Sequence, residues 1–133
     1  MATQTAPLSR EQLAALPESY FKAVDARDVD AIMSHFADDA TLTVQTDHAV
    51  FDGATAIRRM FTDFCDNSAS IFHEIKNTVV EPDAGKVATE QSYIGELADG
   101  TRNDMHNCNF FDVDADGRFS RVIIWMAGTN PLK

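Results

Sequence analysis

The first half of the chain spaces its hydrophobic residues as amphipathic helices do, at intervals of three and four positions. Three such runs follow Ser9, Asp28 and Gly53 in turn. Ser9 and Gln12 fit a capping box, and Asp28 can cap the second helix. Pro17 removes a backbone donor from the first run, so we expect a kink or a short lead-in turn there. The apolar faces of the three helices consist of Leu13, Leu16, Tyr20, Phe21 and Val24, of Val29, Ile32, Met33 and Phe36, and of Ile57, Met60, Phe61 and Phe64.

Alternation with a period of two, typical of β-strands, appears in residues 41–46 and again from residue 71 onward. Glycine-containing turn signals divide the second region into four long segments, about 71–81, 86–97, 102–113 and 118–127. Short connections between long strands predict antiparallel neighbours. Helices followed by such strands predict an α+β fold, in which three N-terminal helices pack on the concave face of a cone-shaped, curved, mixed or antiparallel sheet. The mouth of such a cone is a common site for apolar small molecules.

Size and composition fit one globular domain over residues 1–133, with residues 1–8 expected to fray. Hydrophobic residues make up 44% and charged residues 24%, which lies outside the disordered range. The net charge of −10 repels phosphate backbones and anionic lipids, so we expect neither a nucleic acid nor a membrane as a partner. The chain shows neither an apolar run of roughly 20 residues nor the pattern of a signal peptide, which predicts a cytoplasmic protein.

Several segments agree, in order and spacing, with one known superfamily. They are Tyr20-Phe-x-Ala-x-Asp-Ala-x-Asp28, Phe36-Ala-Asp-Asp-Ala-Thr41, Phe51-Asp-Gly53, His73-Glu-Ile75 and Asp116-Gly117-Arg118. The chain resembles the nuclear transport factor 2-like superfamily, in particular its SnoaL-like branch, over roughly residues 10–130. The resemblance implies the fold but fixes no activity, because this fold hosts isomerases, dehydratases, cyclases, epoxide hydrolases and non-catalytic binders.

Tyr20 and His73 occupy positions that the resemblance connects with catalysis. Tyr20 matches the tyrosine that donates to the substrate oxygen in ketosteroid isomerases, and in a dry cavity it would stabilise a developing oxyanion. His73 resembles the first catalytic histidine of scytalone dehydratase. It alternates with Ile71 and Ile75 on an apolar strand face, where a neutral imidazole would be available as a base. Both residues also fit a structural role in the core.

The other catalytic groups of the known enzymes do not carry over. The general base of ketosteroid isomerases falls at Val44, and their protonated acid falls at or beside Cys108. The late carboxylate of polyketide cyclases falls in Trp125-Met-Ala127, and the second histidine of scytalone dehydratase falls near Leu97. For the epoxide hydrolase relay, Arg102-Asn-Asp104 supplies a local Arg-x-Asp, but one strand too late and without the final aspartate.

His106 is a second candidate base, because it shares one face of its strand with Asp104, Cys108 and Phe110. If that face lines the cone, Asp104 would hold one imidazole tautomer of His106 and raise its basicity. If the face lies on the outer or dimer side of the sheet, neither side chain reaches a substrate.

The sequence gives little support to metal or thiol chemistry. The four histidines show no ligand spacing. Asp112-x-Asp114-x-Asp116-Gly117 copies the first half of a calcium loop, but Ile123 replaces the bidentate acid, and an acidic hairpin turn would contain the same letters. Cys65 lacks a basic partner. We therefore expect no metal and no cofactor.

Two functions are consistent with these residues. The first is a cofactor-independent acid–base enzyme, a lyase or isomerase of dehydratase, isomerase or cyclase type, that acts on a small apolar oxygenated substrate. Its catalytic residues would be Tyr20, His73, His106 and Asp104. The alternative is a non-catalytic small-molecule-binding or dimeric accessory module. The residues expected to bind the small molecule are Phe36, Val44, Phe61, Tyr93, Cys108, Phe110 and Trp125.

The last strand carries apolar residues on both faces, which a sheet with one face in water would not need. Val122, Ile124 and Met126 share one face, and the other face holds Phe119, Ile123 and Trp125. We therefore expect a homodimer, and the resemblance implies that it pairs through the outer surface of the sheet.

Overall fold

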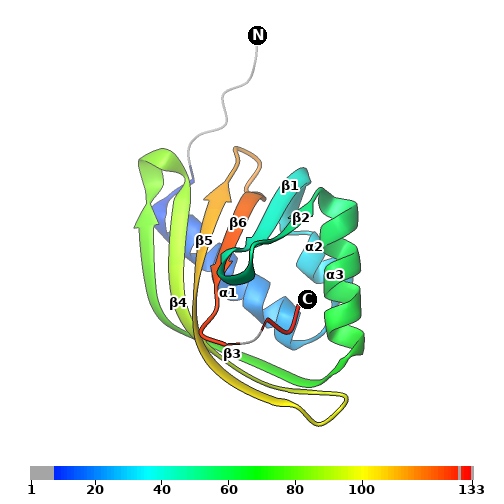
Figure 1. Ribbon diagram of the computed structural model, residues 1–133. Helices are drawn as coiled ribbons and strands as arrows, with labels where there is room; N and C mark the ends of the chain where they lie inside the picture. The colour runs from blue at the N-terminus through cyan, green and yellow to red at the C-terminus, as the bar shows by residue number, and fades with distance from the viewer. Residues whose placement is uncertain (1–7, 129, 133) are drawn as a thin grey trace.

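Six strands form one curved, mixed sheet, and three helices pack against its concave face (Figure 1). The computed structural model describes residues 8–128 and 130–132. The helices are α1 (Arg10–Asp25), α2 (Val29–Met33) and α3 (Ala54–Asp66). The strands are β1 (Phe36–Val44), β2 (Ala49–Asp52), β3 (Ser68–Glu81), β4 (Lys86–Leu97), β5 (Arg102–Val113) and β6 (Phe119–Trp125). Two 3₁₀ turns, η1 (Gln45–Asp47) and η2 (Pro82–Ala84), follow β1 and β3.

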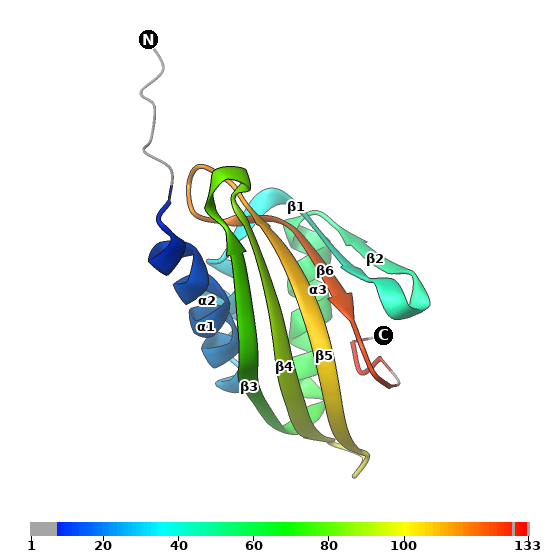
Figure 2. The ribbon, with the colours of Figure 1, turned by 90° about the vertical axis from the view of Figure 1, so that its left-hand side faces the viewer.

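The strands lie in the order β2-β1-β6-β5-β4-β3, and the sheet does not close into a barrel. β1 and β6 pair in parallel, and the other neighbours are antiparallel. The long strands β3, β4 and β5 curve together past the helices (Figure 2). The predicted α+β architecture is therefore confirmed.

The start of α1 has the predicted capping box. Ser9 Oγ accepts a hydrogen bond from the Gln12 N–H at 3.1 Å, and Gln12 Oε1 accepts one from the Ser9 N–H at 2.8 Å. α1 then runs through Pro17 as one helix, so a separate lead-in turn does not occur. Pro17 is fully buried, and its packing offsets the hydrogen bond that its ring removes. Leu8 packs against the core, while the predicted fraying of residues 1–7 lies outside the described residues.

The boundaries of α2, β1 and β2 differ from the prediction. Asp28 caps α2 as expected, with its Oδ1 accepting from the Ala31 N–H at 3.1 Å. The helix ends at Met33, however, and β1 begins at Phe36 instead of Thr41. Phe36 is buried, and a buried phenylalanine fits a helix or a strand equally well. The sequence pattern does not predict β2, because its four residues alternate between half-buried and exposed and include no deeply buried position.

The hydrophobic core fills the space between the helices and the concave face of the sheet. The predicted apolar face of α3 is buried, with none of its four side chains more than 5% exposed. Tyr20 lies at the centre of an aromatic cluster, with ring centroids 5.0–6.1 Å from those of Phe21, Phe36, Phe61, Phe111 and Phe119. Such contacts contribute roughly 0.5–1.5 kcal/mol per pair beyond area burial, so they hold the Tyr20 ring in one orientation.

The register of β5 and β6 decides which side chains face the core. In β5 the odd-numbered side chains point inward, and the buried ones are Met105, Asn107, Asn109 and Phe111. A register shift between β5 and β6 after Asp112 turns Phe119 inward together with Val122. Phe119 is therefore a core residue and not a member of the outer apolar face, which corrects the expectation from simple alternation.

Candidate functional site

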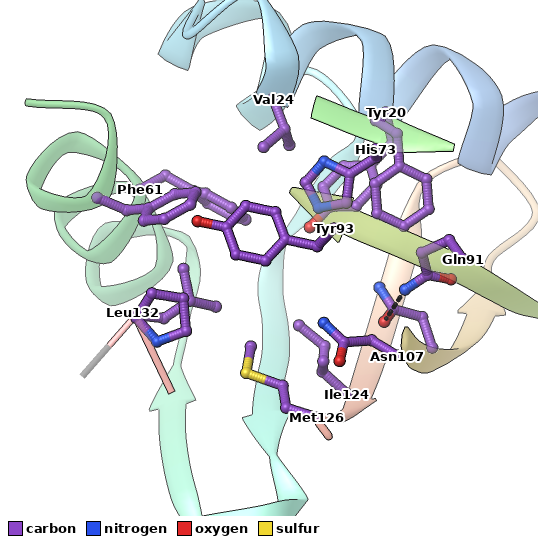
Figure 3. Close-up of a pocket in the computed structure, with 14 residues that line it drawn as sticks. Tyr20, Val24, Phe61, His73, Gln91, Tyr93, Asn107, Ile124, Met126 and Leu132 are labelled. Carbon is purple, nitrogen blue, oxygen red and sulfur yellow. Dashed lines mark hydrogen bonds between the residues drawn. The ribbon is translucent and has the colours of Figure 1, made fainter. Parts of the chain in front are cut away.

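A cavity lies between α1, α3 and the concave face of the sheet (Figure 3). Its volume is about 40 Å³, which is room for a few water molecules. It is lined by Tyr20, Phe21 and Val24 of α1, Phe61 and Phe64 of α3, His73 of β3, Gln91 and Tyr93 of β4, Asn107 and Asn109 of β5, Ile124 of β6, and then Met126, Pro131 and Leu132. Among these described lining residues, His73 alone can carry a charge near neutral pH.

His73 is held in the cavity wall by a carboxylate from another element. Its Nδ1 lies 2.7 Å from Oδ1 of Asp25, the last residue of α1, and its backbone N–H donates to Oδ2 of the same carboxylate at 2.9 Å. The His73 and Asp25 side chains are 11% and 23% exposed. Because an ionised carboxylate only accepts, the neutral imidazole carries its proton on Nδ1 and keeps the lone pair of Nε2 available. This is the arrangement of an oriented general base.

Aromatic rings restrict the His73 imidazole further. Phe21 and Tyr93 both stack on it, with ring centroids 4.6 and 5.2 Å away. Tyr93 is also the cross-strand partner of His73 in the β3–β4 pair. The Tyr93 hydroxyl and the Asn103 Nδ2 are both buried without a hydrogen-bond partner. Burial raises the pKa of Tyr93, so its hydroxyl stays protonated near neutral pH.

Tyr20 presents a second hydroxyl to the cavity. Its side chain is 3% exposed, and no residue in the described part of the chain forms a hydrogen bond with its hydroxyl. Burial in the core, and to a smaller extent the charge of Cys65, raises the pKa of Tyr20 far above its usual value of 10.0. The hydroxyl is therefore a permanent donor near neutral pH, suited to stabilising negative charge on a substrate oxygen.

A row of buried polar side chains lies on the concave face of β4 and β5. Thr89 Oγ1 donates to Gln91 Oε1 at 2.7 Å, and Gln91 Nε2 donates to Asn109 Oδ1 at 2.9 Å. All three side chains are at most 3% exposed. Because its Oδ1 is occupied, Asn109 is oriented with its Nδ2 available as a donor. The neighbouring Asn107 uses its Oδ1 to accept the Ala127 N–H at 3.0 Å.

The sequence pattern does not reveal Asp25 or this polar row as parts of a site. Asp25 is 48 positions from His73 in the chain, so no local motif connects the two. Asn107 and Asn109 alternate with the apolar residues Met105 and Phe111 on one face of the strand, but the opposite face also carries apolar residues, so the pattern alone does not mark either face as inward. Polar residues interrupting an apolar strand face indicate either a paired network or a ligand contact.

Asp104 and His106 lie on the outer face of β5, which corrects the expectation that they meet inside the cavity. His106 is exposed, and its Nε2 pairs with Glu90 Oε2 at 2.8 Å on the neighbouring strand and not with Asp104. The reason is the register, because the odd-numbered side chains of β5 fill the core and turn the even-numbered ones outward. Both side chains are therefore separated from the cavity by the sheet.

The residues expected to bind a small molecule divide into three groups. Phe61 and Tyr93 line the cavity. Phe36 and Val44 are buried in the core but are not part of the cavity wall. The side chains on the outer side of the sheet are those of Cys108, Phe110 and Trp125, of which the last two are 50% and 49% exposed.

In residues 8–128 and 130–132, no three histidine, cysteine or acidic side chains gather as metal ligands would. In the acidic turn, Asp114 Oδ1 accepts from the backbone N–H groups of Asp116 and Arg118 at 2.9 and 3.0 Å, which is the bonding of a hairpin turn. None of the helices in the described part of the chain combines the length and apolarity that crossing a membrane requires.

The fold is shared with solved structures of low sequence identity. A putative aromatic ring hydroxylase from Novosphingobium aromaticivorans is 24% identical, with a TM-score of 0.79 over 92% of this chain and 96% of that one. The epoxide hydrolase/cyclase-like enzyme SalBIII, described for pyran ring formation in the polyether salinomycin, is 20% identical, with a TM-score of 0.80 over 90% and 93%. A putative SnoaL-like polyketide cyclase from Shewanella denitrificans is 12% identical, with a TM-score of 0.77 over 88% and 91%.

These identities show a common fold and leave the activity open. No curated protein matches the sequence. The family model of the SnoaL-like domain matches residues 18–122, from the middle of α1 into β6, and the matched range contains Tyr20, Asp25 and His73. The chain therefore belongs to the SnoaL-like domain family, within the nuclear transport factor 2-like superfamily.

Proposed function

We propose that the protein is a cofactor-independent acid–base enzyme of dehydratase, isomerase or cyclase type, acting on a small, uncharged, largely apolar substrate that carries an oxygen. One observation carries this proposal. His73, oriented by Asp25, presents a free Nε2 at an uncharged cavity that also receives the unpartnered hydroxyl of Tyr20. A base and an oxyanion donor at one water-poor site are the minimum equipment for proton abstraction next to a carbonyl.

The proposed reaction begins with His73 Nε2 taking a proton from a substrate carbon. The electron pair of the broken C–H bond moves toward the substrate carbonyl, and the Tyr20 hydroxyl donates a hydrogen bond to the oxygen on which negative charge develops. The Asp25 carboxylate stabilises the imidazolium that forms on His73. The imidazolium then returns the proton, either to another carbon, which gives isomerisation, or to a leaving hydroxyl, which gives dehydration.

The wall of the cavity favours this class over hydrolysis. Its described lining residues include no carboxylate that could activate a water directly, since Asp25 lies behind His73 and contacts its Nδ1. The amide Nδ2 of Asn109 supplies a further neutral donor. Neutral donors around one base suit a neutral substrate whose charge appears only in the transition state.

Proton exchange tests the proposal without knowledge of the natural substrate. Cyclohexanone and 2-tetralone would be incubated with the protein in D₂O, and deuterium at their α-carbons would be measured by mass spectrometry. We expect exchange faster than in buffer, with a loss on the order of 100-fold in His73→Ala. His106→Ala is the matched control and should retain the wild-type rate. Full exchange in His73→Ala would contradict the mechanism.

A second candidate is a non-catalytic binding module, which the lining of the cavity also supports. None of the described lining residues is a carboxylate, and the neutral donors of Tyr20 and Asn109 can hold a polar ligand group without any proton transfer. Binding of either ketone, seen by calorimetry, without any exchange above the buffer rate would support this alternative against the enzyme.

We further propose that the protein is a homodimer that pairs through the outer face of the sheet. Large apolar side chains are exposed there, namely Phe72 (54%), Ile94 (48%), Phe110 (50%) and Trp125 (49%). Exposed apolar side chains in this number favour self-association. Sedimentation at micromolar concentration should show a dimer, and Trp125→Glu should shift it to a monomer. A monomeric wild-type protein would rule out this pairing.

A further inference from the structure

The residues after β6 lie where the cavity and two surface grooves meet. Pro131 and Leu132 line the cavity, and they also line a groove of about 280 Å³ beside α3. Pro131 further borders a groove of about 430 Å³ near the start of β5. Phe64 belongs to both the cavity and the α3 groove, so the side chains of Phe64, Pro131 and Leu132 separate these two spaces.

Side-chain contacts, and not sheet pairing, hold this segment in place. β6 ends at Trp125. Asn130 Nδ2 then donates to the Asp47 carboxylate of η1 at 3.2 Å, and Asn130 Oδ1 accepts the Leu132 N–H at 2.8 Å. Asn130 is 8% exposed, so these contacts are shielded from water. Nearer to β6, the Met126 N–H donates to Thr46 Oγ1 of η1 at 2.7 Å, and the Ala127 N–H donates to Asn107 Oδ1. Asn130 therefore supplies the contact with η1 that is nearest to Leu132, and substituting it loosens the end of the segment without removing a sheet hydrogen bond.

Leu132 closes the side of the cavity that lies away from the base. Figure 3 shows Leu132 near Phe61 and across the cavity from His73. Leu132 is half-buried and packs against the core. The enclosed volume of about 40 Å³ is well below the roughly 150 Å³ of a cavity that binds benzene. A ligand with even one ring requires part of this wall to move.

We propose that Pro131 and Leu132 form a cover that closes the cavity and sets the size of the neutral ligand that it admits. The inference rests on the cavity being the ligand site of the proposed function. The ligand enters from the α3 groove, which also contains Arg59 and Asp63, when the cover moves aside. The cavity behind the cover selects a neutral molecule, because its described lining residues include no charged group other than His73. The apparent affinity is the intrinsic affinity multiplied by the fraction of molecules whose cover is open. Loosening the cover raises this fraction and therefore raises the apparent affinity.

The test measures binding of phenol and 2-naphthol, two neutral aromatic alcohols that differ by one ring, using the full chain. In Leu132→Ala we expect the affinity for 2-naphthol to rise about tenfold and that for phenol no more than about twofold, because the added space admits the second ring. Asn130→Ala keeps Leu132 but removes the contact of Asn130 with Asp47, and it should raise both affinities by a similar factor of about three to ten. Leu132→Trp should lower both.

Val79→Ala is the matched control, because it shortens an aliphatic side chain that is 61% exposed on β3. It should bind both alcohols as the wild type does, and shifts of the His73 ring signals in NMR spectra should report that the probes occupy the cavity. Unchanged 2-naphthol affinity in Leu132→Ala, or an equal rise for both probes, would overturn the cover. Such a result alongside a lost exchange rate in His73→Ala would leave the proposed function standing. If Leu132→Ala instead changes the affinities as expected while His73→Ala keeps the full exchange rate, the proposed enzyme activity would be wrong and the cover would stand.

Discussion

A histidine–carboxylate pair lies on each face of the sheet, and the two pairs have nearly the same contact distance. On the concave face, His73 Nδ1 lies 2.7 Å from Asp25 Oδ1, and the side chains are 11% and 23% exposed. On the outer face, His106 Nε2 lies 2.8 Å from Glu90 Oε2, with exposures of 54% and 43%. The contact distance therefore does not distinguish them, whereas the surroundings do.

Burial decides what each pair can do. Around His106 and Glu90, water screens the charges, and such exposed pairs contribute roughly 0–1 kcal/mol to stability. Around His73 and Asp25, aromatic rings and the helix exclude most water, so the orientation of the imidazole is fixed and its free nitrogen faces a cavity. A histidine next to a carboxylate indicates a candidate base only when its other nitrogen reaches a space that a ligand can occupy.

The largest difference should appear in proton exchange when the two carboxylates are neutralised. Asp25→Asn can present an amide N–H to His73 Nδ1 and so favour the tautomer protonated on Nε2, which cannot act as a base. We expect a loss on the order of 100-fold or more in ketone exchange. Glu90→Gln is the matched change on the outer face and should alter the rate less than twofold. Equal effects of the two substitutions would remove the distinction between the pairs.

Stability should separate the same carboxylates by a smaller amount. Asp25→Ala leaves both the His73 backbone N–H and its ring N–H without their acceptor, so we expect a loss of about 1–3 kcal/mol in the free energy of unfolding. Glu90→Ala should cost about 0–1 kcal/mol. Urea unfolding of both variants at the same low protein concentration measures the two values. A larger cost for Glu90→Ala would show that the outer pair is the structural one.

The two cysteines extend the comparison to thiol reactivity. Burial, and after it the charge of Asp66, raises the pKa of Cys65, while Arg27 opposes this. A raised pKa means less thiolate at a given pH, and the buried side chain is also less accessible. At pH 8, Ellman's reagent should therefore modify Cys108 at least about tenfold faster than Cys65. The modification should show a fast phase for Cys108 and a slow phase for Cys65. Cys108→Ser should remove the fast phase, and a fast phase that remains in this variant would contradict the expectation.

The smallest effect on chemistry is expected for His106→Ala. Its exchange rate should stay within twofold of the wild type, since the sheet separates His106 from the cavity. The variant should instead change self-association, because His106 lies on the face proposed for the dimer, and sedimentation at several concentrations would detect this. A tenfold loss of exchange with an unchanged association constant would place the chemistry on the outer face.

Local sequence signals were sufficient for most of the fold. The Ser9–Gln12 capping box, the Asp28 cap and the long strands between glycine turns each depend on residues that are neighbours in the chain. β2 lacked such a signal, because it is short and buries no side chain deeply. The pattern does not predict the start of β1 at Phe36, because the spacing of Phe36 from Ile32 also fits a helix.

The site depended on information that local patterns do not contain. Alternation groups the side chains of β5 into two faces but does not say which face is inward, since Met105 and Phe111 on one side resemble Cys108 and Phe110 on the other. The partner of His73 comes from the far end of α1, and only the packed helix brings Asp25 to it.

The buried amides of β4 and β5 also bear on how this fold diversifies. Asn109 faces the cavity with its acceptor oxygen already engaged, and Asn107 stands beside it. Asparagine and aspartate have the same shape, and a single-nucleotide change converts one codon into the other. Burial would disfavour the ionised form of an aspartate at either position, so its carboxylate would bind a proton more tightly and act as a stronger base. A single asparagine-to-aspartate substitution in the polar row would therefore introduce a carboxylate base at the cavity with little change in packing.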